Sequence, residues 1–229
     1  MCGIVGLYLK DVELQPSLGV LFAPMLIEMT DRGPDSAGFA IYRDPVDGDQ
    51  TKFTLASDDL DIDWRALNAE VERALDCDVR INLWGDHAVL VTDAQATATQ
   101  VWLGKNRPDL RIVGSGRSIE IFKQTGLPKD VVAAFALTRA HGSHAIGHTR
   151  MATESAVTTA GSHPFATGLD LCLVHNGSLS NHNHLRRELE RDGIVFQTDN
   201  DTEVAAGFMT AKLRQGKSFL EALQAGLVE

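Results

Sequence analysis

Two patterns of apolar residues follow one another in the N-terminal region, first that of a strand and then that of a helix. Residues 4–9 form a short, partly β-branched apolar run that predicts a buried strand. From residue 16 to about residue 30, apolar residues recur every three or four positions, the spacing of an amphipathic helix. Gly33 and Pro34 end that pattern, and residues 37–42 predict a second strand. We therefore expect a strand, a helix packed on it, and a second strand.

The stretch from residue 44 to about residue 142 has a less regular pattern. It opens with a run of aspartates typical of a solvated face. Apolar spacing after Trp64 predicts a helix, and residues 80–91 predict a hairpin that turns at Gly85-Asp86. We found no internal repeat and no low-complexity linker here. The stretch is therefore interpreted as an insertion built onto the domain rather than as a domain of its own.

The pattern sharpens again in the last third of the chain. Residues 145–150 predict a strand that ends in polar residues, and residues 171–174 predict another that runs into His175-Asn176-Gly177. Binding groups often lie on loops that a rigid sheet holds in place, so these two strand ends are candidate site positions. Helices are predicted near residues 181–191 and after residue 203. A capping box, Ser218 with Glu221, predicts the start of a last helix.

Composition excludes several classes of protein. The 229 residues carry a formal net charge of −10 and no cluster of Lys and Arg, which argues against a nucleic-acid surface. Three cysteines without a CxxC pair favour a reducing, cytoplasmic setting over a disulfide framework. No apolar run is long enough to span a membrane. The eight histidines have no recognisable partner set of metal ligands, so we expect neither a metal nor a cofactor.

Cys2 is a candidate nucleophile because of its place in the chain. A small second residue allows removal of Met1, which would leave a thiol and a free α-amine on the same residue. An α-amine is partly neutral near pH 7 and can accept the proton of the thiol. A cysteine that merely follows the initiator methionine is the alternative, so this position needs partners elsewhere in the chain.

Those partners occur in order along the chain, and together the motifs resemble the class II glutamine amidotransferases, a group of the N-terminal-nucleophile hydrolases. The motifs span residues 1–6, 32–38, 147–153, 175–177 and 200–203. The resemblance implies an α+β fold, a four-layer αββα sandwich of two antiparallel sheets between helical layers. It implies one glutamine amidotransferase domain over residues 1–229 with an insertion at about 44–142. We also expect the C-terminus of the fold to be incomplete, since this fold usually continues into further strands.

The resemblance implies hydrolysis of glutamine to glutamate and ammonia. Cys2 would attack the side-chain amide, and Asn176 with the backbone N–H of Gly177 would stabilise the oxyanion. The two charged ends of glutamine would be bound by a cation and an anion. The residues assigned to the substrate are Arg150 for the carboxylate, Asp201 for the ammonium, Thr153 for an extra hydrogen bond, and Arg32, which would also hold the N-terminus.

The expected partner is a separate synthase that accepts the ammonia, in an oligomeric assembly. The long insertion and the sequence of residues 151–155 most resemble the amidotransferase subunit of N-methylglutamate synthase and glutamate-synthase-like systems. Met151 and Glu154 depart from the usual family residues. Two alternatives stay open: another N-terminal-Cys amidohydrolase acting on an apolar amide, and a non-catalytic regulatory or assembly subunit. Each residue also has a simpler explanation, such as a plain turn at Asn176-Gly177 or a helix cap at Asp201.

Overall fold

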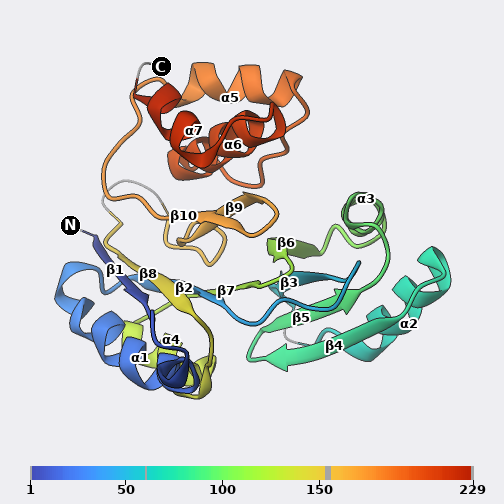
Figure 1. Cartoon of the computed structure of the whole chain (residues 1–229), viewed down its shortest axis with the longest axis horizontal. Coiled ribbons are helices and arrows are strands. Elements are labelled where there is room, and N and C mark those ends of the chain that lie inside the picture. The colour runs from blue at the N-terminus through green and yellow to red at the C-terminus, as the bar shows by residue number, and fades with distance from the viewer. Residues whose placement is uncertain (1, 60, 153–155, 228–229) are drawn as a thin grey trace.

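The protein has an α+β fold built around two four-stranded antiparallel sheets (Figure 1). The computed structural model describes residues 2–59, 61–152 and 156–227. In spatial order, the strands of the first sheet, here called sheet A, are β1 (Gly3–Tyr8), β8 (His144–Arg150), β2 (Ser36–Tyr42) and β7 (Ile119–Thr125). Strands from the first and middle thirds of the sequence thus meet in one sheet.

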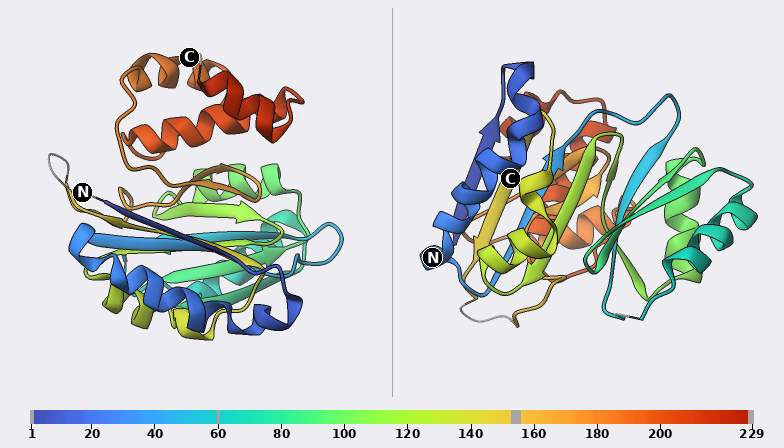
Figure 2. Two further views of the ribbon diagram at one scale, coloured as in Figure 1. Left: turned by 60° about the vertical axis from the view of Figure 1, so that its left-hand side comes forward. Right: turned by 90° about the horizontal axis from the view of Figure 1, so that it is seen from below.

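Helices cover one face of sheet A, which we call its lower face (Figure 2). They are η1 (Val12–Ser17), α1 (Leu18–Glu28), η2 (Thr30–Arg32), α4 (Pro128–Ala134) and η3 (Leu137–Arg139). The core of this interface is apolar, because Leu18, Phe22 and Leu26 recur at helical spacing and are fully buried. Gly147 of β8 allows the close approach, since a Cβ there would lie 2.9 Å from the ring of Phe22.

The predicted helix differs from the observed one in which side chains it buries. The sequence pattern assigns Leu21 and Met25 to the packed face, but 42% and 36% of these side chains is exposed. Helix α1 is apolar on nearly every side, so the spacing of its apolar residues does not reveal which stripe faces the sheet.

The second sheet, sheet B, belongs to a compact unit with its own core. Its elements in chain order are β3 (Thr51–Ser57), α2 (Trp64–Leu75), β4 (Val79–Trp84), β5 (His87–Thr92), α3 (Ala96–Asn106) and β6 (Leu110–Gly116). The strands lie in the order β4-β5-β3-β6. This βαββαβ order with its first and third strands in the centre is the split-βαβ arrangement of ferredoxin-like folds.

The stretch interpreted as an insertion, 44–142, therefore contains two parts. Residues 51–116 build the ferredoxin-like unit, whereas β7 and α4 belong to sheet A and its helical cover. The strand β3 was hidden in the sequence because all seven of its side chains are buried, so it lacks the alternation of a half-buried strand.

Above the upper face of sheet A lie a small hairpin and a helical layer (Figures 1 and 2). The hairpin is β9 (Phe165–Gly168) with β10 (Leu171–Leu173), and the helices are α5 (His182–Arg191), α6 (Asp201–Arg214) and α7 (Phe219–Gly226). Apolar contacts join the hairpin to sheet A on one side and to these helices on the other. The α+β fold with two antiparallel sheets and helical layers is confirmed. Within the described residues, no helix is both long and apolar enough to cross a membrane.

Candidate active site

The site lies where β1 begins and β8 ends. Gly3 pairs with Thr149 across these two strands, so one further step in register sets Cys2 opposite Arg150. On its other side Arg150 pairs with Ser36 of β2. Alternation along β8 turns Ala145 and Gly147 toward α1, and it therefore turns Arg150 to the upper face. Sheet A thus places both candidate residues at one end.

Two side chains hold the backbone of Cys2. The Asn176 amide donates from Nδ2 to the carbonyl oxygen of Cys2 at 3.0 Å, and Arg32 donates from Nε to the same oxygen at 3.4 Å. The Cys2 sulfur lies 4.0 Å from the carbonyl oxygen of Met151. Residue 2 is therefore in direct contact with two of the residues that the motifs single out.

The turn that carries Arg32 is packed tightly against the end of β8. A side chain at Gly33 would collide with the backbone of Thr149 and Arg150, so only glycine fits this crossing. Asp35 accepts a hydrogen bond from the backbone N–H of Ala152 at 2.7 Å. The sequence suggested no role for Asp35, yet its carboxylate holds the first residues of the loop that follows β8.

Arg150 itself anchors that loop. Its side chain is buried, and its Nη1 donates to the carbonyl oxygen of Ala156 at 3.2 Å. Thr153, expected to contact substrate, and Glu154 lie outside the described residues.

Asp201 and Gly177 shape the loop after β10. Asp201 accepts from the backbone N–H of Leu179 at 2.8 Å, so it contacts the same loop as Asn176 but at a different point. Gly177 lies directly against the His175 ring, since a Cβ there would sit 2.8 Å from the ring nitrogen Nε2. The structure thus brings Cys2, Arg32 and Asn176 into contact, with Arg150 on the next strand, while Asp201 braces the loop.

Buried titratable groups lie behind this surface, on the upper face of sheet A. His148 and His163 stack with their ring centroids 4.0 Å apart. Burial lowers the pKa of His148 to about 4 and that of His163 to about 2, so both rings are neutral near pH 7. His148 lies in the motif of residues 147–153, but nothing in the sequence singled out His163 or indicated that the two rings stack.

Lys123 is a second buried group that sequence reasoning missed. Its ammonium donates to the carbonyl oxygens of Ala160, Ser162 and Pro164, and burial lowers its pKa to about 7. Lys123 and Arg150 therefore hold the loop between β8 and β9 from two directions.

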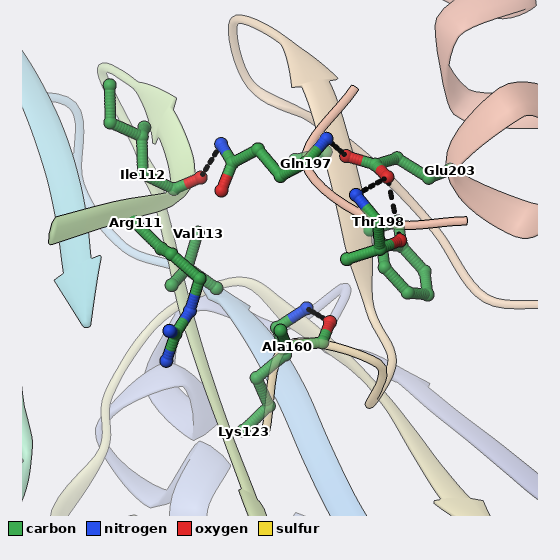
Figure 3. A pocket seen from close by; sticks show the side chains of 10 residues that line it. Arg111, Ile112, Val113, Lys123, Ala160, Gln197, Thr198 and Glu203 are labelled. Carbon is green, nitrogen blue, oxygen red and sulfur yellow. Dashed lines mark hydrogen bonds between the residues drawn. The ribbon is translucent and has the colours of Figure 1, made fainter. Parts of the chain in front are cut away.

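A small cavity lies beside Lys123 (Figure 3). Its volume of about 20 Å³ suits a single water molecule. Gln197 and Thr198 close one side, because their backbone N–H groups donate to the buried carboxylate of Glu203. A wider groove of about 390 Å³ runs between α3, the β9-β10 hairpin and α6. Cys2 lines neither space.

Comparison with known proteins identifies the family of this chain. Residues 136–226, which carry Arg150, Asn176 and Asp201, match the family described as "Glutamine amidotransferase domain". The chain is 55% identical over 228 residues to the "Glutamine amidotransferase-like protein GlxB" of Rhizobium meliloti, an alignment that covers 99% of this chain and 75% of that protein. The chain belongs to the class II glutamine amidotransferase family.

Further relatives agree with that assignment. A "Putative glutamine amidotransferase" of Methanothermobacter thermautotrophicus is 32% identical over 98% of this chain and 76% of its own length. The "Glutamine--fructose-6-phosphate aminotransferase [isomerizing]" of Vibrio cholerae is 33% identical over 53% of this chain, which is 20% of that enzyme. Among solved structures, the glutamine phosphoribosylpyrophosphate amidotransferase of B. subtilis covers 98% of this chain at 19% identity with a TM-score of 0.49, and this chain covers 32% of that enzyme.

Proposed function

We propose that this chain, after removal of Met1, hydrolyses the side-chain amide of L-glutamine and passes the ammonia to a separate synthase. The observation that carries the proposal is the contact between residue 2 and the loop of Asn176, with Asn176 Nδ2 3.0 Å from the Cys2 carbonyl oxygen. A nucleophile needs an adjacent oxyanion site, and this contact supports Asn176 as one of its donors.

The chemistry requires a base and two oxyanion donors. The Cys2 sulfur attacks the amide carbon while the α-amine of Cys2 takes the thiol proton and then returns it to the departing nitrogen, which leaves as ammonia. Water hydrolyses the remaining thioester to glutamate and restores the thiol. An Asn amide nitrogen carries two hydrogens, so Asn176 can bond the Cys2 carbonyl with one and the oxyanion with the other, beside the N–H of Gly177.

Arg150 and Asp201 are proposed to bind the two ends of glutamine, with Thr153 adding a hydrogen bond. A guanidinium has five N–H donors, so Arg150 can keep its bond to Ala156 and still reach a carboxylate. Oδ2 of Asp201 accepts from Leu179, so Oδ1 is the candidate partner of the substrate ammonium. Oδ1 also lies 3.4 Å from the Thr202 hydroxyl, and a carboxylate oxygen can accept from both donors. Arg32 would hold residue 2 in place through its carbonyl.

The acceptor of the ammonia is proposed to be a separate synthase subunit, of the N-methylglutamate or glutamate synthase kind, joined to this chain in an oligomer. Support comes from the resemblance of the motifs and from the family membership. Co-purification with candidate synthases, followed by ammonia transfer at limiting free ammonium, identifies the acceptor.

The test of the proposal combines the intact mass of the purified chain with glutamine turnover. We expect loss of Met1, release of glutamate, and a fall in turnover of about 10⁴-fold or more in Cys2→Ala, since loss of a nucleophile removes most of the catalytic effect. An intact Met1, or undiminished turnover by Cys2→Ala, would contradict the proposal. If the unaltered chain is inert yet changes a synthase's use of ammonia, the non-catalytic subunit is the correct alternative.

Specificity has its own test. If Arg150 binds the substrate carboxylate, glutamine must react much faster than 4-aminobutanamide, the same molecule without that group. Equal rates for the two amides would favour the alternative of an amidohydrolase acting on apolar amides.

A further inference from the structure

The first turn of α6 holds three separate segments near the site. Asp201 accepts from Leu179, and Glu203 accepts from the backbone of Gln197 and Thr198. Between them, the Thr202 hydroxyl lies 2.8 Å from His163 Nε2 and 3.5 Å from His175 Nδ1. Of these three described side chains, Thr202 is the one that links two histidines, and it is 1% exposed.

These contacts close into a ring of four side chains and one backbone carbonyl. His148 Nε2 donates to the carbonyl oxygen of His175 at 3.1 Å, and the His148 ring stacks on the His163 ring. Starting from Thr202, the contacts thus run through His163 and His148 to His175 and back. We call His148, His163, His175 and Thr202 the histidine–threonine ring. Its members come from four segments that are distant in sequence.

One member of the ring, His175, lies next to the two proposed oxyanion donors. His175 precedes Asn176, and its imidazole packs on Gly177 so closely that a Cβ there would lie 2.8 Å from Nε2. Asn176 and Gly177 are exposed, whereas His148, His163 and Thr202 are buried. The exposed donors therefore take their position from a buried support.

The Thr202 hydroxyl is well suited to this task because it both donates and accepts. A hydroxyl carries one hydrogen and two lone pairs, so it can bond both imidazoles, with its hydrogen directed to one of them or to Asp201 Oδ1, which lies 3.4 Å away. Valine has nearly the same shape but neither ability, so it would leave buried polar atoms of the ring without a partner.

We propose that Thr202 is a positioning residue that holds the loop of His175, Asn176 and Gly177 where its donors can reach the oxyanion. This proposal rests on the proposed function. Thr202 touches no reacting atom and acts through His175. Misplacement of donors by about 1 Å can cost about 10²-fold in rate, while binding of the far end of the substrate is affected little.

The test compares Thr202→Val and Thr202→Ser with a matched control in the same helix. Thr210 is also buried, and its hydroxyl lies 2.8 Å from that of Thr167, away from the ring. We expect Thr202→Val to lower kcat for glutamine about 10²-fold with KM changed less than about threefold. Thr202→Ser should retain most of the kcat of the unaltered chain, and Thr210→Val should leave kcat unchanged.

A second readout does not depend on turnover. Amide hydrogen exchange of residues 175–179 should speed up in Thr202→Val and stay unchanged in Thr210→Val. If the unaltered chain shows no glutamine turnover, the proposed function fails, and the exchange data still decide whether Thr202 holds the loop. Unchanged exchange, or faster exchange with an unchanged kcat, would overturn the positioning role.

Should Thr202→Val fail to fold, His148→Leu breaks the ring at its bond to the His175 carbonyl oxygen. The same loss of kcat and the same faster exchange are then expected. A folded His148→Leu with normal values for both would overturn the proposal.

Discussion

Sheet A separates two interiors of different character. Below it, Phe22 and Leu26 of α1 pack with Phe39 of β2 in an apolar core. Above it, buried polar side chains gather between the sheet and the hairpin, and they include the histidine–threonine ring, Lys123 and Arg150. Because alternate residues of a strand face opposite sides, one strand such as β8 supplies both interiors.

The difference shows how stability and proposed activity divide across one sheet. Apolar side chains below the sheet favour folding whatever their direction, since hydrophobic burial has no angular requirement. Polar side chains above it must each find a partner at a fixed distance and angle, which makes their arrangement specific. Substitutions below should therefore change stability at every pH, and substitutions above should change turnover or the pH dependence of stability.

The largest expected effect is in the lower interior. Phe22→Ala should lower the free energy of unfolding by about 3–5 kcal/mol, because it leaves a cavity at a fully buried site. Urea titration measures the change, and turnover per folded molecule should stay within about twofold. Leu21→Ala, at the neighbouring exposed position, is the matched control and should stay within about 0.5 kcal/mol. Equal losses of free energy of unfolding in the two variants would contradict the division of stability and activity between the two faces of sheet A.

The next effect is at the exposed edge of the upper interior. Asn176→Ala should lower kcat about 10²–10³-fold, since it removes one oxyanion donor. Its side chain is exposed, so the melting temperature should hardly change. Ser180→Ala, in the same loop, is the control and should keep kcat. A normal kcat in Asn176→Ala would show that this amide serves only to hold Cys2.

The smallest effect, per pH unit and per histidine, is on the pH dependence of stability. Folding lowers the pKa of His148 to about 4 and of His163 to about 2, both from an ordinary value of 6.5. Between pH 6.5 and 4 the unfolded chain therefore binds more protons than the folded one. Stability is lost as the pH falls through this window, by about 1.4 kcal/mol per pH unit for each histidine.

Urea titrations at several pH values between 4.5 and 6.5 measure this slope. His148→Gln keeps a donor for the His175 carbonyl oxygen but cannot titrate. The slope of its free energy of unfolding against pH should therefore be smaller by about 1.4 kcal/mol per pH unit, which corresponds to one proton. An unchanged slope would show that His148 is not the group that titrates. Lys123, whose folded pKa is about 7, acts in a separate window, where stability rises between pH 7 and about 10.5.

Part of the local structure could be predicted before the fold was known. The hairpin turn at Gly85-Asp86 and the Ser218 capping box are as expected, because each depends on neighbouring residues alone. The end of β8 at Arg150 also matches its polar ending in the sequence. The strands β3 and β7 were not predicted, since strands buried on both faces lose the alternation that marks them.

Roles that depend on contacts between distant segments were beyond prediction. Asp35 and Thr202 stood inside recognisable motifs, yet nothing nearby in sequence reveals that one holds Ala152 and the other joins two histidines. Arg150 was expected to serve substrate, and the fold gives it a bond to the loop as well. Thr153 stays a prediction, outside the described residues.

Residue types and their order along the chain indicated the proposed reaction, because a thiol beside an α-amine, a strand-end Arg and an Asn-Gly loop together resemble a known family. They could not set the distance between Cys2 and Asn176, which depends on the register of β1 against β8 and on the packing of α6 over the sheet. Register and packing arise from many contacts across the whole chain, so position had to come from the folded structure.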